Sequence, residues 1–183
     1  MNALRPGADP APVPPPLQGA VVRLRAAGRG DVTDLAEIRR SSEVYAWWRG
    51  GDDLEAAVEE DLAEDGINAY VIEHEGRTVG WIQWQAEEEP DYRHASIDIY
   101  LDPAVRGRGL GTDAVRTVAR HLFVDQGHHR IEIDPAVDNA AAIRSYTKVG
   151  FKPVGRTRRS ERGPDGTWHD SLLMDLLAEE LLE

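Results

Sequence analysis

The sequence predicts an α/β fold in which helices flank a mixed, mostly antiparallel central sheet of about six to seven strands. Two observations lead to this class. First, segments with alternating apolar residues, typical of strands, are interspersed with segments whose apolar residues recur at helical spacing. Second, these segments follow the order β–α–α–β–β–β–α–β–α–β–β, with no internal repeat. A length of 183 residues fits a single domain that can bury a core.

The first half of the chain supplies a strand, two helices and a hairpin. The helices show apolar positions at helical spacing, and the hairpin strands flank a turn that contains a glycine. Gly80, within the second hairpin strand, indicates a bulge or a close approach of backbones. The expected elements are a strand at 21–25, a helix capped by Asp31, an acidic helix at 54–64, and hairpin strands at 70–74 and 78–84.

Two adjacent tryptophans, Trp47 and Trp48, precede a Gly50-Gly51 break. Glycine pairs interrupt regular structure, so the segment 44–51 is predicted to be a loop. Aromatic rings in such a loop either wall a substrate pocket or anchor the loop on the core, and the second outcome is the commoner one.

The second half alternates strands and helices before a final hairpin. In the strand 95–101, Ile97, Ile99 and Leu101 share one face, whereas Asp98 and Tyr100 share the other. The remaining expected elements are a helix after the glycines at 107–111, a strand at 130–134, a helix at 140–149 that stops at Gly150, and strands at 151–157 and 167–177.

Composition narrows the classes of function. Acidic residues outnumber basic ones by 33 to 21, for a formal charge of −12, which argues against a nucleic-acid partner because such binding requires a basic face. The absence of cysteine excludes disulfides, a thiol nucleophile and cysteine-ligated metals. No apolar run approaches the roughly eighteen residues that span a bilayer, and no signal peptide is recognisable. We therefore expect a cytoplasmic protein without a membrane partner, either a monomer or a homodimer.

The charge and the prolines are unevenly distributed. Acidic residues cluster at 52–65 and at 86–91, where they either attract a cationic ligand or form a solvated face that keeps the protein soluble. Residues 1–19 contain six prolines among alanine and glycine. They are predicted to form a disordered tail before a single domain at 20–183.

The most informative stretch runs from Leu101 to Thr112, where glycines at 107, 109 and 111 stand among arginines. A strand that turns through glycines into a helix directs backbone N–H groups and the positive end of the helix dipole at one spot, which suits a phosphate. A dinucleotide fold would need an acidic residue about twenty residues later in an early βαβ unit, and a Walker loop would need the absent Gly-Lys-Ser/Thr. A glycine-rich turn that only caps a helix is the alternative.

Two motifs together resemble the GCN5-related N-acetyltransferase (GNAT) superfamily. The first is Arg106-x-x-Gly109-x-Gly111, which resembles the pyrophosphate loop of that family. The second is the segment 138–151, where an asparagine opens a helix, a tyrosine follows seven residues later and Gly-Phe closes it. The resemblance covers roughly residues 20 to 177 and implies the GNAT fold with acetyl-coenzyme A as cofactor.

Further segments are similar to the aminoglycoside N-acetyltransferases of the 6′ type. They are Trp47-Trp48-x-Gly-Gly, Ile97-Asp98, and Asp134-Pro135 followed by Asn139, Ala142-Ile143-Arg144 and Tyr146. This resemblance implies transfer of an acetyl group from acetyl-coenzyme A to a primary amine of a polycationic aminoglycoside, which would give antibiotic resistance. The acidic segments would then flank the acceptor.

The resemblance also implies roles for single residues. Tyr146 would stand beside the coenzyme A sulfur as the catalytic acid, and Asp98 would be the catalytic carboxylate facing the amine. Asn139 would hydrogen-bond the pantetheine arm or a nearby water. The implied cofactor-binding residues are Leu101, Arg106, Gly107, Arg108, Gly109, Leu110, Gly111, Thr112, Asp134, Asn139, Ala142 and Tyr146. The implied acceptor-binding residues are Trp47, Trp48, Glu88, Asp98 and Asp134.

The chemistry of amine acylation supports these roles independently. A protonated amine attacks a thioester only after it loses a proton, so a nearby carboxylate serves as base or anchor. Asp98 is polar on a strand of apolar residues, which suits a pocket wall or, alternatively, a solvent-facing position. Tyr146 shares a helix face with Ile143 and Val149, so packing in the core is its alternative role. For Asn139 the alternative is a plain N-cap.

Other functions stay open on the sequence alone. The acceptor could be another small amine, such as a hydroxylysine siderophore precursor, or the N-terminus or a lysine of a protein. A non-catalytic acyl-coenzyme A-binding module is a further alternative, against which the presence of both Tyr146 and Asp98 argues. No metal is predicted, because the histidines at 74, 94, 128, 129 and 169 lack ligand spacing; surface positions are expected for them.

Overall fold

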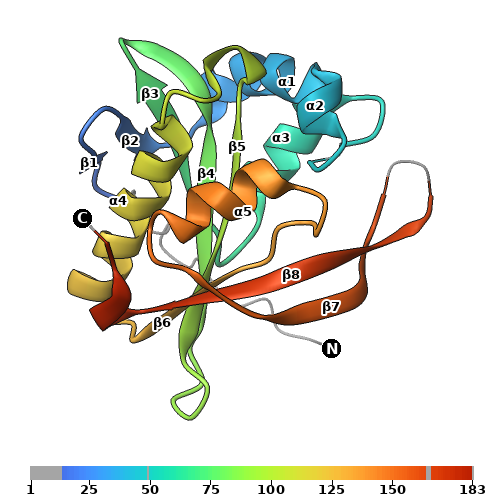
Figure 1. Cartoon of the computed structure of the whole chain (residues 1–183). Helices are drawn as coiled ribbons and strands as arrows, with labels where there is room; N and C mark the ends of the chain where they lie inside the picture. Colours follow the sequence, from blue (N-terminus) through green and yellow to red (C-terminus); the bar gives the residue numbers. More distant parts are fainter. Residues whose placement is uncertain (1–13, 49, 164–165, 183) are drawn as a thin grey trace, which may run out of the picture.

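The computed structural model describes residues 14–48, 50–163 and 166–182. One eight-stranded sheet has the order β1-β2-β3-β4-β5-β6-β8-β7, and helices lie on both of its sides (Figure 1). The α/β class is confirmed, with a slightly larger sheet than predicted. The additional strand is β1, Leu17–Gln18, which pairs with β2 although the sequence placed it in the tail. Residues 1–13 of that tail lie outside the described residues.

The other strands come from the segments whose apolar alternation predicted them. Neighbouring strands are antiparallel except β5 and β6, which are parallel. The strand β4 runs further than expected because its pairing with β5 continues to Glu87, opposite His94. The bounds are β2 Arg23–Ala26, β3 Asn68–His74, β4 Arg77–Glu87, β5 His94–Leu101, β6 Arg130–Ile133, β7 Lys152–Arg162 and β8 Trp168–Leu177.

Five α-helices accompany the sheet within the described residues. The segment predicted to be a loop begins with a short helix, α2, because the Ser41 side chain caps it by accepting the Val44 N–H at 3.3 Å. Asp31 does not cap α1 through its side chain and pairs instead with Arg25. No described helix is long and apolar enough to cross a membrane. The bounds are α1 Val32–Arg40, α2 Ser42–Tyr45, α3 Leu54–Ala63, α4 Leu110–Val124 and α5 Ala140–Thr147.

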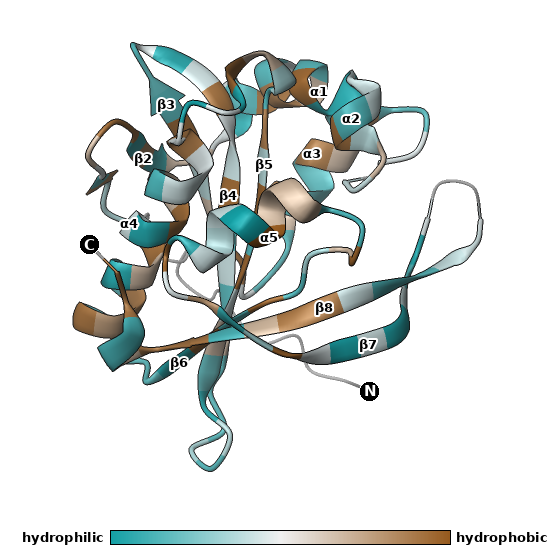
Figure 2. Ribbon diagram, viewed as in Figure 1, coloured by the Kyte–Doolittle hydropathy of each residue, from teal (hydrophilic) through white to brown (hydrophobic). Residues whose placement is uncertain are grey.

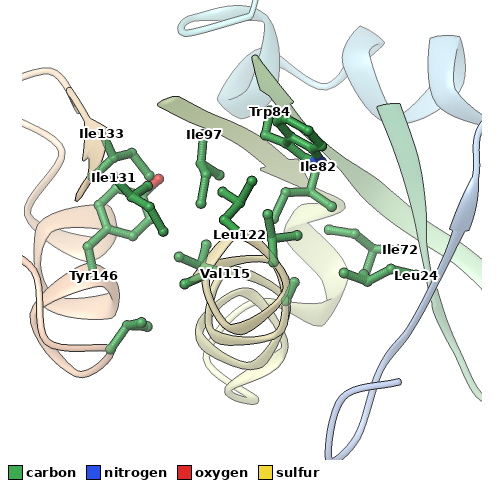
Figure 3. Packing of buried hydrophobic residues seen from close by; sticks show 14 of the residues in the cluster. Leu24, Ile72, Ile82, Trp84, Ile97, Val115, Leu122, Ile131, Ile133 and Tyr146 are labelled. Atoms are coloured by element: carbon green, nitrogen blue, oxygen red, sulfur yellow. The ribbon is translucent and has the colours of Figure 1, made fainter. Parts of the chain in front are cut away.

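The sheet buries apolar residues on both faces. On one face α4 packs Val115 and Leu122 against the strands, as Figure 3 shows. On the other face Leu35 of α1 and Val58 of α3 pack around Tyr100. Figure 2 shows that the edge strand β7 is mostly hydrophilic, and nearly all of it is exposed.

The strands β5 and β6 separate soon after they begin. Among the described residues of β5, only Ala95 and Ser96 pair with β6. The strand β6 ends at Ile133, and the chain after it stays beside β8, where the Leu172 N–H donates to the Pro135 carbonyl at 2.8 Å. The last residues of β5 are therefore open on the side that leads to α5.

A close backbone approach joins β4 to the end of β5, and a buried carboxylate joins the start of α4 to the chain before β2. A Cβ at Gly80 would lie 2.3 Å from the Tyr100 carbonyl oxygen, which confirms the close approach predicted there. Asp113, in the first turn of α4, is 6% exposed. Its carboxylate accepts the backbone N–H groups of residues 20, 21 and 22 at 3.0, 2.8 and 3.0 Å. This carboxylate therefore attaches the chain before β2 to the helix that follows the glycine loop.

Candidate active site

A cavity of about 360 Å³ lies where the end of β5, the glycine loop, α5 and the segment after α2 meet. It is lined by residues far apart in the sequence, because the separation of β5 from β6 leaves this part of the sheet open. The predicted site residues that line it are Trp47, Trp48, Leu101, Arg106, Gly107, Gly109, Leu110, Gly111, Thr112, Asn139, Ala142 and Tyr146.

The glycine loop presents its backbone to this cavity. Gly107 and Gly109 have φ angles of +76° and +81°, and a Cβ added at either would meet nothing within 4 Å. Gly111 serves packing instead, since a Cβ there would lie 3.0 Å from Leu101 Cδ1. The first hydrogen bond of α4 runs from the Asp113 N–H to the Gly109 carbonyl at 3.0 Å. The N–H groups that precede it are not used by the helix and are available to an anion.

Basic side chains border the same cavity in a chain of strongly negative charge. They are Arg106, Arg144 and Lys148. Sequence reasoning missed the last two, although their spacing of one helical turn beside the α5 motif was an available signal. The Thr112 hydroxyl lies 2.7 Å from that of Ser145 and joins α4 to α5. The free N–H groups and these cations fit the phosphates of coenzyme A.

The helix α5 carries Asn139 and Tyr146 to the cavity. The Asn139 side chain accepts the Ala142 N–H at 3.2 Å, which confirms the N-cap, while its contact with coenzyme A stays a prediction. Tyr146 is 7% exposed and packs against Phe151, with ring centroids 6.2 Å apart. Figure 3 shows its ring beside Ile133 of β6. Tyr146 therefore belongs to the core and to the cavity wall at once.

Negative charge gathers next to Tyr146. Burial, together with the charges of Asp98 and Asp134, raises the pKa of the Tyr146 hydroxyl well above its ordinary value. Desolvation, followed by the charges of Asp98, Glu161 and Glu132, raises the pKa of Asp134 to about 6, although the residue is exposed at the surface. Neither Asp98 nor Asp134 lines the cavity itself. Their charges nevertheless act on the tyrosine at its wall.

Asp98 lies on the opposite face of β5 from α4. Residues alternate along a strand, so Asp98 shares the face of Tyr100, whereas Ile97 packs in the α4 core. Gln83 Nε2 donates to Asp98 Oδ2 at 3.5 Å, and Trp81 Nε1 donates to Gln83 Oε1 at 2.9 Å. Burial raises the pKa of Asp98, and the hydrogen bond from Gln83 opposes that rise. Asp98 is half-buried but is not part of the cavity lining.

Glu161 joins these carboxylates from β7, and sequence reasoning missed it. Its charge raises the pKa of both Asp98 and Asp134. The pairing of β7 with β8 shifts between Thr157 and Glu161. Arg159, inside that shift, has a φ of +52°, and its N–H donates to Asp170 at 2.7 Å. Such a bulge re-aims the side chains that follow it, and strict alternation along the sequence does not reveal it.

The two tryptophans form an aromatic wall of the cavity. Trp48 lies edge-on against Tyr100, with ring centroids 4.9 Å apart and an interplanar angle of 64°. Trp47 is 42% exposed. Trp48 therefore meets both expectations, because it anchors the segment on the core and also lines the cavity.

Several predicted residues lie elsewhere. Arg108 does not line the cavity, and its Nη2 atom lies 3.4 Å from Nε2 of His74. Glu88 lies on the β4–β5 connection, at the opposite end of β5 from the glycine loop, where it pairs with Arg93 at 3.1 Å. The structure therefore does not bring Glu88 to the cavity. None of the described residues of the acidic segment 52–65 lines it either.

The histidines form no metal site in the described part of the chain, where no group of three or more histidine or carboxylate side chains could hold a metal ion. The expectation that they lie at the surface is wrong for His128. This residue is 4% exposed, and its ring centroid lies 6.3 Å from that of Trp84. Burial lowers the pKa of His128, which favours the neutral imidazole.

The chain is similar in sequence and in structure to known acetyltransferases. Residues 22–152 match the model of the acetyltransferase (GNAT) domain family. The aminoglycoside N(6′)-acetyltransferase type 1 of Klebsiella pneumoniae is 32% identical in an alignment of 165 positions that covers 79% of each chain. The mycothiol acetyltransferase of Tsukamurella paurometabola is 29% identical over 82% of this chain and 54% of its own. The crystal structure of the aminoglycoside acetyltransferase AAC(6′)-Ib in complex with coenzyme A is 29% identical, with a TM-score of 0.72 over 87% of this chain and 96% of its own.

Proposed function

The chain belongs to the GNAT family of acetyl-coenzyme A-dependent N-acetyltransferases, and we propose that its acceptor is a primary amine of an aminoglycoside. The observation that carries this proposal is a group of interacting carboxylates: the charges of Asp98 and Asp134 act on Tyr146, and the charge of Glu161 acts on Asp98 and Asp134. Aminoglycosides carry several ammonium groups, so clustered carboxylates offer them complementary charge. The similarity to aminoglycoside acetyltransferases supports the same acceptor.

The glycine loop and the basic side chains of the cavity would bind and orient the acetyl donor. Acetyl-coenzyme A, when bound, supplies the thioester carbonyl that the amine attacks. The N–H groups of the glycine loop and the side chains of Arg106, Arg144 and Lys148 would hold its phosphates, because both are directed at the same cavity. Binding by fixed backbone groups orients the donor without ordering long side chains.

Asp98 and Tyr146 would carry out the two proton transfers of the reaction. Asp98 would take the proton of the ammonium group, directly or through a water, and its raised pKa makes it a stronger base than an ordinary aspartate. Tyr146 would donate its hydroxyl proton to the leaving sulfur. The raised pKa of Tyr146 keeps that proton in place at neutral pH. Asp134, with a pKa of about 6, is mostly ionised at neutral pH and would bind an ammonium group of the acceptor.

A thiol-release assay with acetyl-coenzyme A tests the acceptor. Kanamycin, hydroxylysine and a peptide amine would be compared at about 0.1 M and about 1 M salt, between which the Debye length falls from about 10 Å to about 3 Å. We expect acetylation of kanamycin, with a KM that rises with salt because several charge pairs are screened. Hydroxylysine, with fewer charges, should show a flatter response.

The outcomes separate the alternatives. If hydroxylysine or the peptide is acetylated and kanamycin is not, at either salt concentration, the aminoglycoside assignment is wrong while the donor site stands. If none of the three amines is acetylated although coenzyme A binds, the aminoglycoside assignment is wrong and a non-catalytic binding module becomes the favoured alternative.

A further inference from the structure

Arg39, near the end of α1, is buried beneath the aromatic wall of the cavity. Its side chain is 2% exposed, and its Nη1 atom lies 2.7 Å from Oδ2 of Asp61 in α3. A buried guanidinium is tolerated when it is paired and hydrogen-bonded. The same Asp61 oxygen accepts Trp48 Nε1 at 3.4 Å. One carboxylate therefore joins the buried cation to the indole of the wall.

The guanidinium of Arg39 also contacts the two rings of the wall. Its Cζ atom lies 5.8 Å from the ring centroid of Trp48 and 5.9 Å from that of Tyr100. A guanidinium within about 6 Å of a ring centroid is attracted by the aromatic face, and more strongly when it is desolvated. Trp48 is thus held by Tyr100 at its edge, by Arg39 and by Asp61.

The glycines after the tryptophans belong to the same arrangement. A Cβ at Gly50 would lie 2.6 Å from Cβ of Ala57 in α3 and 3.8 Å from Cζ of Arg39. Gly51 follows with a φ of +68°. The chain therefore passes directly over α3 and Arg39, and only glycine fits the first position. The Gly-Gly pair therefore lets the chain after the tryptophans pack against α3 and Arg39.

We propose that Arg39 and Asp61 are positioning residues that hold Trp48 against Tyr100 before the acceptor binds, and that they thereby set the affinity for the acceptor. The wall is the acceptor side under the function proposed above, because Tyr100 lies two residues from Asp98 on the same face of β5. Neither Arg39 nor Asp61 lines the cavity, so both act through Trp48. A wall fixed in advance costs no ordering when the acceptor arrives.

Asp61→Asn and Arg39→Lys test this proposal, with Glu37→Gln as the matched control. Glu37 is an exposed carboxylate on the same helix as Arg39, so its variant removes one negative charge without touching the wall. Arg39→Lys keeps the buried charge opposite Asp61 but removes the planar group that lies over the rings. It gives a second test should Asp61→Asn fold poorly. The readouts are kanamycin kinetics, coenzyme A affinity by calorimetry and the indole N–H spectrum of nitrogen-15-labelled tryptophan, in which Trp48→Phe assigns the Trp48 signal.

We expect Asp61→Asn and Arg39→Lys to shift the Trp48 indole signal and to raise the KM for kanamycin about tenfold, with kcat and coenzyme A affinity changed less than about twofold. Glu37→Gln should match the wild type. A shifted indole signal with an unchanged KM, or an equal rise in KM in Glu37→Gln, overturns the proposal. If the wild type does not acetylate kanamycin, the acceptor assignment fails. The positioning role is then decided by the indole signal, and an unshifted signal in both variants refutes it.

Discussion

The glycine loop offers the sharpest quantitative test of the donor site. Gly109 has a φ of +81°, and a Cβ added there would meet nothing within 4 Å. Alanine at this position therefore causes no clash, and its cost is the strain of a left-handed backbone, about 1–2 kcal/mol. If the loop of Gly109→Ala relaxes, its N–H groups turn away from the anion, and recovering the binding conformation costs the same amount. Coenzyme A affinity should accordingly fall about fivefold to thirtyfold.

Two other glycines provide matched controls. Gly127, after the far end of α4, has a φ of +67° and open space at its Cβ position, so Gly127→Ala carries the same strain away from the site. Gly28 has a φ of −155° and similar open space, so Gly28→Ala carries no strain. In thermal unfolding, Gly127→Ala should lower Tm by about 2–8 °C and Gly28→Ala should not, whereas Gly109→Ala should lower Tm only to the extent that its loop keeps the left-handed backbone.

Calorimetric titration with coenzyme A then decides the role of the loop. Only Gly109→Ala should bind more weakly than the wild type. Wild-type affinity in Gly109→Ala, with a Tm that is not lowered either, would refute the reasoning that the loop binds phosphate through its backbone. An equal loss in Gly127→Ala would attribute the effect to general destabilisation instead.

Four further predictions concern the chemistry and the frame of the site. Tyr146→Phe should lower kcat about 100-fold with little change in either KM, because the hydroxyl acts mainly as the thiolate leaves; wild-type turnover would make Tyr146 a packing residue only. Asp98→Asn should lower kcat/KM and move the pH optimum upwards, because the amine then loses its proton to solvent, and an unmoved optimum in the pH–rate profile would exclude Asp98 as the base. Glu161→Gln removes a charge that raises the pKa of Asp98 and Asp134. The acid limb of kcat/KM, expected near pH 6 from Asp134, should therefore move to lower pH, and a shift to higher pH would contradict the electrostatic coupling. Asp113→Ala leaves three backbone N–H groups without their carboxylate and should cost about 1–3 kcal/mol of unfolding free energy in urea titration; an unchanged midpoint would show that water replaces the carboxylate without cost.

The sequence identified most of the glycine-loop and α5 residues that line the cavity, because their conformation is local. The glycine loop and the helix opened by Asn139 each lie within about a dozen consecutive residues, and backbone conformation decides what they do. Likewise, alternation placed Asp98 on the face opposite Ile97. Those features need no knowledge of which distant segments meet.

Parts of the proposed acceptor side escaped prediction because they depend on contacts between segments that are distant in the sequence. Glu161 reaches Asp98 through a bulge in β7 that no alternation pattern reveals. An arginine near the end of a helix usually serves the helix dipole, so nothing marked Arg39 as the buried support of Trp48. The opposite error concerned Glu88, where an acidic cluster suggested a ligand although the β4–β5 turn carries it away from the cavity.

The separation of β5 from β6 has a consequence for how such a protein diverges. The cavity at this gap has two sides, formed by the glycine loop with α5 on one and by the segment after α2, which rests on α1 and α3, on the other. Few residues line both sides of the cavity. Substitutions in the β7–β8 hairpin or beneath the tryptophans can therefore accumulate while the residues proposed to bind the donor stay the same. Relatives of this chain can therefore exchange one amine for another through changes at the periphery, and the shared half preserves their common ancestry.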